Sequence, residues 1–150
     1  MPEDRVEDEE VLYRRVRHEY LVFIEGEWKC GENAFGDPDQ QPSVDRAKLQ
    51  GDSPHPTRAE PSDGIARLVA TKVRAIQTVV KRRPSGVQEY PYRIDIKPDP
   101  TEQAHRGFNP AHARIYATPE EKMGSKAWRM LKDELSAMAI MELPPEKVDT

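Results

Sequence analysis

Cysteine and glycine are scarce in this chain, with one cysteine, Cys30, and 8 glycines among 150 residues. A single cysteine excludes an internal disulfide and a zinc site built from several thiolates. The histidines at 18, 55, 105 and 112 lack the close spacings of metal ligands, and no glycine-rich segment has the context of a phosphate-binding loop. We therefore expect no metal site and no cofactor, and we interpret Cys30 as a small, half-buried side chain.

Long apolar runs are also missing. No stretch approaches the roughly 18 apolar residues that cross a bilayer. The start, Met1-Pro2-Glu3-Asp4, lacks the basic and apolar parts of a signal peptide. These absences predict a soluble, cytoplasmic protein with no membrane contact. A length of 150 residues, with 36% hydrophobic and 33% charged side chains, fits one domain with a modest core.

The net charge of −4 is unevenly distributed along the chain. Residues 1–10 contain six acidic side chains and one arginine, and their few apolar groups predict an acidic, disordered tail. Residues 142–150 follow the same logic and are predicted to be a flexible C-terminal tail. The single domain is then expected over 11–141. Its mildly basic charge leaves nucleic acid open as a partner without favouring it.

Hydrophobic periodicity predicts an α+β fold with a small, mostly antiparallel sheet covered by a C-terminal helix. The strands of this sheet are expected at about 11–17, 20–24, 77–81, 91–96 and 112–117. Residues 28–30 can add a short strand. The helix is expected over 119–141, with Thr118 as its cap and Pro119 at its first position.

Two segments between these elements are harder to interpret. Residues 31–63 are rich in proline and polar side chains, which predicts a long polar loop. Within it, Ser43 is expected to cap a helical turn whose neighbours Val44 and Leu49 face the core. For 64–81 two patterns compete: one long helix, or a strand, a short helix and a second strand.

Two short blocks, Pro42–Leu49 and Asn109–Ile115, carry the catalytic candidates. If they meet in one cleft, His112 could act as an acid or base that Asp45 orients. Ser43 could complete a nucleophilic triad, although it lacks a glycine-flanked elbow and a recognisable oxyanion donor. The alternative interpretation is structural: Ser43 and Asp45 cap a turn, and His112 is a hydrogen-bonded structural residue.

Arginines are the candidates for binding an anion such as a phosphate, namely Arg14, Arg46 and Arg114. Alternation in the first strand places Arg15 and Arg17 on one face and Arg14 with Val16 on the other. One of these arginines is therefore expected on the core side, in need of a carboxylate or a ligand. The alternative for Arg46 is an ion pair with a neighbouring carboxylate.

Several blocks of the chain resemble a group of short, uncharacterised bacterial proteins. These blocks are Ser43-Val44-Asp45-Arg46, Asp63-Gly64-Ile65-Ala66-Arg67-Leu68 followed by Val73-Arg74-Ala75, Lys97-Pro98-Asp99-Pro100 and Asn109-Pro110-Ala111-His112-Ala113. The resemblance covers about residues 11–140 and implies no known activity. It favours the strand, short helix and strand pattern over 64–81.

Two classes of function follow from these patterns. The first is a non-catalytic bacterial accessory or protein-interaction module, in which loop 31–63 contacts a partner protein. The second is a small enzyme or binder of a phosphate-bearing ligand, RNA or a nucleotide, that uses Arg14, Arg46, His112 and Arg114. Convergence of Ser43, Asp45 and His112 in one cleft is the observation that bears most directly on this choice.

Overall fold

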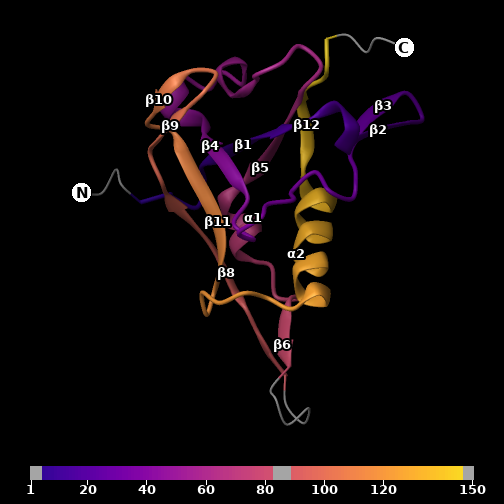
Figure 1. Ribbon diagram of the computed structural model, residues 1–150, viewed down its shortest axis with the longest axis vertical. Helices are drawn as coiled ribbons and strands as arrows, with labels where there is room; N and C mark the ends of the chain where they lie inside the picture. The colour runs from indigo at the N-terminus through magenta and orange to yellow at the C-terminus, as the bar shows by residue number, and fades with distance from the viewer. Residues whose placement is uncertain (1–4, 83–88, 147–150) are drawn as a thin grey trace.

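The computed structural model describes residues 5–82 and 89–146. Its centre is a six-stranded sheet in the order β12-β5-β1-β4-β11-β8 (Figure 1). The strands are β1 (Val11–Val16), β4 (Ser43–Arg46), β5 (Gly64–Val69), β8 (Arg93–Pro98), β11 (His112–Thr118) and β12 (Ile140–Leu143). Every neighbouring pair is antiparallel. The predicted α+β fold class is confirmed.

Short hairpins and helices surround the sheet. The hairpins pair β2 (Leu21–Ile24) with β3 (Glu27–Cys30), β6 (Val80–Arg82) with β7 (Glu89–Pro91), and β9 (Thr101–Gln103) with β10 (Gly107–Asn109). The helices are α1 (Ala70–Arg74), α2 (Ser125–Met138) and the 3-10 turns η2 (His18–Tyr20), η3 (Ala47–Gln50) and η4 (His55–Thr57). Among the described residues, no helix has the length and apolar run that a bilayer crossing requires.

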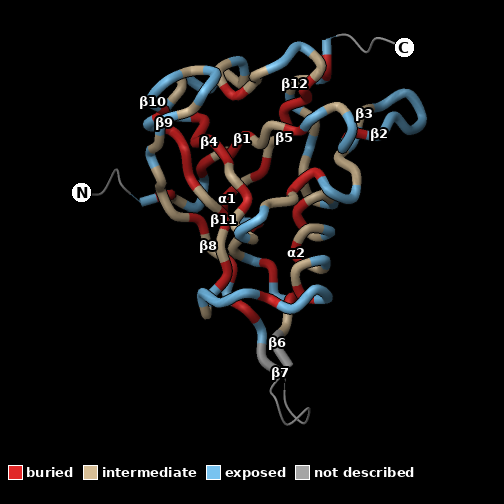
Figure 2. Tube along the Cα trace, in the orientation of Figure 1, coloured by how far each residue is buried: buried red, intermediate tan, exposed pale blue. Residues whose placement is uncertain are grey.

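The core lies between the sheet and α2. In β1, Leu12 and Val16 belong to the main buried cluster, and Leu131 and Leu135 of α2 join the same cluster. Figure 2 shows this buried interior in red along the strands and along one side of α2. Each fully buried leucine contributes about 2 kcal/mol through the burial of its apolar surface.

The C-terminal helix is shorter than the apolar pattern predicts. The expected helix over 119–141 is wrong at both ends, because α2 begins at Ser125 and ends at Met138. At the N-terminal end, the Met123 amide donates to the side chain of Gln40, and Gly124 occupies the cap position instead of Thr118. At the C-terminal end, Ile140–Leu143 pair with β5 as an edge strand, so sheet pairing outweighs helical periodicity there.

The segment 31–63 is not a loop throughout. Ser43–Arg46 form β4, an interior strand between β1 and β11, and Ser43 therefore does not cap a helical turn. The turn that follows begins at Ala47. Val44 is buried as expected, whereas Leu49 is 40% exposed, so the prediction that Leu49 faces the core is wrong.

The N-terminal segment packs on the domain from residue 5 onward, which corrects the predicted disordered tail over 1–10. Val6 is fully buried, and Glu10 is 5% exposed. The main-chain oxygens of Asp8 and Glu10 accept hydrogen bonds from the amides of Thr71 and Ala70. Composition suggested a tail because the sequence does not reveal these long-range partners. The predictions for residues 1–4 lie outside the described residues.

Three further predicted segments match the structure only in part. The strand, short helix and strand pattern over 64–81 is confirmed by β5, α1 and β6, although β6 begins only at Val80. The strands expected at 20–24 and 77–81 exist as β2 and β6, but they pair with β3 and β7 outside the main sheet. The tail predicted for 142–150 is wrong at 142–146, because 142–143 belong to β12 and the Glu146 amide donates to the Pro61 oxygen at 2.9 Å. Its last residues, 147–150, lie outside the described residues.

Candidate functional site

A cleft of about 900 Å³ lies beside β1, β4 and β11. Ser43, Asp45 and His112 all line it, so the three catalytic candidates do meet at one cleft. His112 lies opposite Asp45 on the neighbouring strand, and Asp45 lies opposite Tyr13. Because directly opposed residues share a face of an antiparallel sheet, these three side chains form a row across it.

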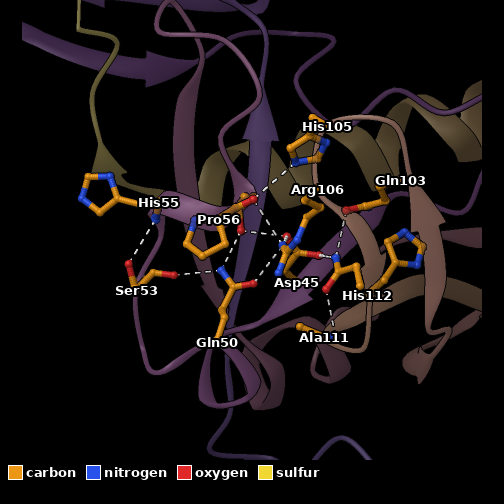
Figure 3. Close-up of polar contacts among 12 residues, drawn as sticks. Asp45, Gln50, Ser53, His55, Pro56, Gln103, His105, Arg106, Ala111 and His112 are labelled. Atoms are coloured by element: carbon orange, nitrogen blue, oxygen red, sulfur yellow. Dashed lines mark hydrogen bonds and ion pairs between the residues drawn. The ribbon is translucent and has the colours of Figure 1, made fainter.

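The carboxylate of Asp45 is the centre of a buried hydrogen-bond network (Figure 3). Its Oδ1 accepts from Nδ2 of Asn109 at 2.7 Å, and its Oδ2 accepts from the Thr57 hydroxyl at 2.7 Å. The guanidinium of Arg106 adds an ion pair at 3.3 Å. Asp45 therefore holds Asn109, Thr57 and Arg106 together and does not orient His112 through a hydrogen bond.

Asp99 is the partner that orients His112. Nδ1 of His112 is 2.7 Å from the main-chain oxygen of Asp99 and 3.4 Å from Oδ2 of the same residue. A carbonyl oxygen only accepts hydrogen bonds, so Nδ1 carries the proton. In the neutral ring, Nε2 then presents its lone pair as an acceptor. Figure 3 shows the ring turned away from Asp45.

Nε2 of His112 faces the cleft. Within the described residues it has no hydrogen-bond partner. The buried side-chain nitrogens without partners in the same part of the chain are Nδ1 of His18 and Nε of Arg58, so Nε2 of His112 is not sealed in the interior. Since the His112 side chain is only 3% exposed and lines the cleft, its acceptor is presented from the cleft wall.

Ser43 does not complete a triad with His112. It lies opposite Arg114, two residues along β11 from His112. The contact that the structure gives Ser43 on the cleft side is made by its main-chain oxygen, which accepts from Arg14 Nη1 at 2.9 Å. Within the described residues no hydrogen bond joins the Ser43 hydroxyl to His112, so the nucleophile and base are not coupled as a triad requires.

Arg14 is the arginine on the core side of β1, where the alternation predicted one arginine without saying which. Its guanidinium donates to the main-chain oxygens of Ala34, Gly36 and Ser43 at 2.9–3.0 Å and lies 5.5 Å above the ring of Phe35. Burial lowers the pKa of Arg14 to about 10, which keeps the side chain charged at neutral pH. Its partners are neutral carbonyls in place of the expected carboxylate or ligand.

The other two arginines that could bind an anion, Arg46 and Arg114, are each paired with a carboxylate of the chain itself. Arg46 forms a bidentate pair with Glu10, in which both nitrogen–oxygen distances are 2.9 Å. Arg114 donates from Nε to Oδ2 of Asp99 at 2.7 Å. Asp99 thus contacts both Arg114 and His112. The prediction that Arg46 pairs with a carboxylate is confirmed, and that carboxylate lies in the supposed tail.

Sequence patterns did not identify the residues that organise this cleft. Asp99 and Asn109 each precede a proline, a signal for turns beside a strand but not for their hydrogen-bond partners. Thr57 and Arg106 lie in polar connections with no periodicity that could place them. Their roles depend on the register of β4 against β11, which the chain order alone does not specify.

Cys30 is half-buried, as expected, and burial raises the pKa of its thiol to about 11. The thiolate is the reactive form, so the native thiol should react slowly. At about pH 8, we expect dithionitrobenzoate to modify Cys30 about a hundredfold more slowly in the native chain than in the denatured chain. Equal rates, measured from thionitrobenzoate absorbance, would contradict this expectation.

The described side chains do not form a metal site. Across residues 5–82 and 89–146, no group of three or more His, Cys, Asp or Glu side chains is placed to hold a metal ion.

The resemblance to short bacterial proteins stays a prediction. Comparison of the chain with protein-family models, with curated proteins and with solved structures finds no match.

Proposed function

We propose that the protein is a non-catalytic accessory module that binds a partner protein through the hairpin of β2 and β3. The observation that carries this proposal is the exposure of Val22, Phe23 and Ile24, at 38%, 60% and 48%. Successive strand residues point to opposite faces, so the strand presents apolar side chains to solvent on both sides. Contiguous exposed apolar groups of this kind are typical of interaction sites.

The hairpin is held in one conformation before any partner binds. Its turn residues Glu25 and Gly26 both have positive φ, 52° and 80°, which is the geometry of a tight two-residue turn. At its base, the Gly31 amide donates to the Tyr20 carbonyl oxygen at 2.8 Å. A Cβ at Gly31 would lie 2.9 Å from that oxygen, so glycine permits the approach.

The hairpin projects from the body of the domain (Figure 1), and its tip is exposed (Figure 2). The ring of Phe23 packs edge-to-face on Trp28 with centroids 5.1 Å apart. This contact joins the two strands by their side chains. A rigid, projecting apolar element loses little conformational entropy on binding, which favours its use as a docking element.

Charge at the tip indicates the chemistry of the partner. Glu25 and Glu27 flank the apolar strand residues, so a pocket that accepts the hairpin should be apolar with a basic rim. A groove of about 830 Å³ continues from the hairpin and is lined by Trp28, Ile140 and Met141. Two copies of the chain would bring their acidic tips together, which disfavours self-association through this surface.

The proposed contact surface differs from the loop 31–63 named in the sequence-based hypothesis. Ala34 and Phe35 in that segment are buried, and β4 lies inside the sheet. Most apolar groups of this segment therefore lie in the chain's own core, and Leu49, at 40% exposure, stands alone. The hairpin keeps its apolar groups in solvent, which is why the proposal rests on it.

A photo-crosslinking residue tests this proposal in the cells that naturally produce the chain. Placed at Phe23, it should give a discrete crosslinked partner protein. The matched control is Phe108 on β10, which is 58% exposed on another hairpin and should give none. With that partner purified, Phe23→Ser should weaken binding at least about tenfold and Phe108→Ser about twofold or less. Equal products at both positions, or a product of two copies of this chain, would contradict the proposal.

A further inference from the structure

Positive charge in the cleft exceeds what the chain itself balances. The cleft is lined by the cationic side chains Arg14, Arg15, Arg17 and Lys132 and by the carboxylates of Asp37 and Asp45, and Arg15 is already paired with Asp63 at 2.7 Å. Among these cations, Arg14 donates only to neutral carbonyls in its hydrogen bonds. The charge of Asp45 is already offset by its ion pair with Arg106. A half-buried charge without a contacting carboxylate creates a positive potential that favours an anion.

Two of the cations are available to a ligand. Arg17 is exposed, and its guanidinium has no hydrogen-bond or ion-pair partner within the described part of the chain. Lys132 contacts Asn33 Oδ1 at 3.2 Å, a neutral group on an exposed residue. Arg17 directly follows β1 and Lys132 lies in α2, so the two cations reach the cleft from different elements and each can contact a phosphate.

Aromatic side chains accompany these cations along the cleft. Tyr20 is 38% exposed, and Trp128 is half-buried with Lys132 Nζ 5.5 Å from its ring centroid. Both aromatic residues line the cleft. Tyr13 and His112 lie on strands two positions apart in the sheet, a separation of roughly 10 Å, so the cleft spans β1, β4 and β11. A groove that combines cations with ring faces is the arrangement that binds single-stranded nucleic acid.

Nε2 of His112, which has no partner in the described residues, sets a requirement on the sugar of a bound nucleotide. Because Nδ1 donates to Asp99, Nε2 of the neutral ring accepts, so a ligand must bring a donor to it. The ribose 2′-hydroxyl is a donor that every RNA nucleotide carries and DNA lacks. Base amino groups are donors as well, but they differ among the bases and occur in both nucleic acids.

We infer that the cleft binds single-stranded RNA. Backbone phosphates lie at Arg17 and Lys132, bases stack on Tyr20 and Trp128, and one ribose 2′-hydroxyl donates to Nε2 of His112. This site is separate from the hairpin surface, and neither proposal depends on the other. The small net positive charge of the cleft implies moderate affinity with a strong dependence on salt.

The test of the cleft uses a labelled, mixed-sequence RNA of about 12 nucleotides and fluorescence anisotropy at several salt concentrations. The double variant Arg17→Ala/Lys132→Ala should weaken binding about tenfold and reduce the slope of log affinity against log salt by about 1.4. The matched control Lys72→Ala/Arg129→Ala removes the same charge from exposed positions outside the cleft lining. Its affinity should stay within about twofold of the unchanged protein. Equal losses in both double variants, or no RNA binding at low salt, would overturn the inference.

The sugar contact has its own test on the unchanged protein. The same sequence as DNA and as 2′-O-methyl RNA should bind about fivefold more weakly than RNA, because both lack the hydroxyl donor. His112→Phe should make RNA bind like DNA while leaving the DNA affinity unchanged. The 2′-O-methyl measurement decides the matter even if His112→Phe fails to fold. Equal affinity for RNA and 2′-O-methyl RNA would overturn the role of His112.

Discussion

Replacing Glu10 by leucine is expected to lower the free energy of unfolding by about 3 to 5 kcal/mol, because it removes one member of a buried ion pair. The side chains of Glu10 and Arg46 are 3% and 2% exposed, and they share two hydrogen bonds of 2.9 Å. Arg46 therefore stays buried after the substitution and loses the two charge-assisted hydrogen bonds that Glu10 accepts. Urea denaturation followed by circular dichroism measures the loss.

An exposed ion pair gives the matched control. Lys97 Nζ and Glu120 Oε1 are 2.7 Å apart, but their side chains are 39% and 51% exposed. Solvent screens such a pair, so Glu120→Leu should change stability by at most about 1 kcal/mol. Similar losses for Glu10→Leu and Glu120→Leu would show that the N-terminal segment does not pack on β4 as described.

The same pair makes stability depend on pH in a defined direction. Burial acts to raise the pKa of Glu10, but hydrogen bonds from Arg46 and the Glu7 amide, with the charges of Arg46 and Lys48, outweigh it. The pKa therefore lies below its ordinary value of 4.5. A carboxyl whose folded-state pKa is lowered stabilises the fold above its unfolded value, and this contribution is lost as the pH falls through the folded value.

Asp95 shifts in the same direction. Burial again acts to raise its pKa, but hydrogen bonds from Arg74 and the Ile96 amide and the charges of Arg74 and Arg93 lower it overall. Stability should thus decline as the pH drops below about 4.5. Glu10→Gln removes one of the two titrating groups, so the difference in unfolding free energy between neutral and acidic solution should shrink in that variant.

Local patterns predicted the elements that are specified by local residues. Alternation in β1 placed Arg14 with Val16 on one face and Arg15 on the other, although it did not say which face meets the core. The apolar stripe of α2 was equally clear in its interior. In these two elements the side-chain period of a single segment carries the information, so no knowledge of distant partners is needed. For 64–81, periodicity left one long helix and a strand, short helix and strand open, and β5 and α1 match the second.

Elements that depend on distant partners were not predictable in this way. The four residues of β4 lie in a proline-rich stretch, and they become an interior strand only because β1 and β11 pair with both of their edges. Composition assigns Glu10 to an acidic tail, because its ion pair with Arg46 becomes visible only in the folded chain. The sequence around Asp99 indicates only a turn, because its contact with His112 depends on the strand register.

The candidate site shows the same division. Sequence order suggested that Ser43, Asp45 and His112 meet, and they do line one cleft. The hydrogen bonds that assign chemical roles depend on side-chain geometry, which composition does not determine. Asp45 is bound to Asn109 and Thr57, and the carboxylate beside His112 belongs to another strand end. The three residues therefore line one cleft, but the hydrogen bond by which Asp45 was expected to orient His112 is made by Asp99 instead.

Replacing Asp45 by alanine is expected to lower the free energy of unfolding by about 3 kcal/mol, because it leaves three buried or half-buried donors without their acceptor. Those donors belong to Asn109, Thr57 and Arg106. Asp45→Asn keeps the shape and one acceptor oxygen, so its loss should be smaller, about 1 to 2 kcal/mol. Urea denaturation of both variants, followed by circular dichroism, measures the two losses.

These two variants also separate a structural role of Asp45 from a direct role at His112. Asn109 Oδ1 accepts from the Ala111 amide at 2.9 Å, so Asp45 fixes the backbone that leads into His112. Asp45 thus acts on His112 through Asn109 and Ala111, not through a contact with the imidazole. If Asp45 oriented the imidazole directly, Asp45→Ala would leave the unfolding midpoint unchanged, and that result would contradict the network. Because Asp45→Asn retains the connection to Asn109, it should keep His112 in place and preserve the expected preference for RNA over DNA.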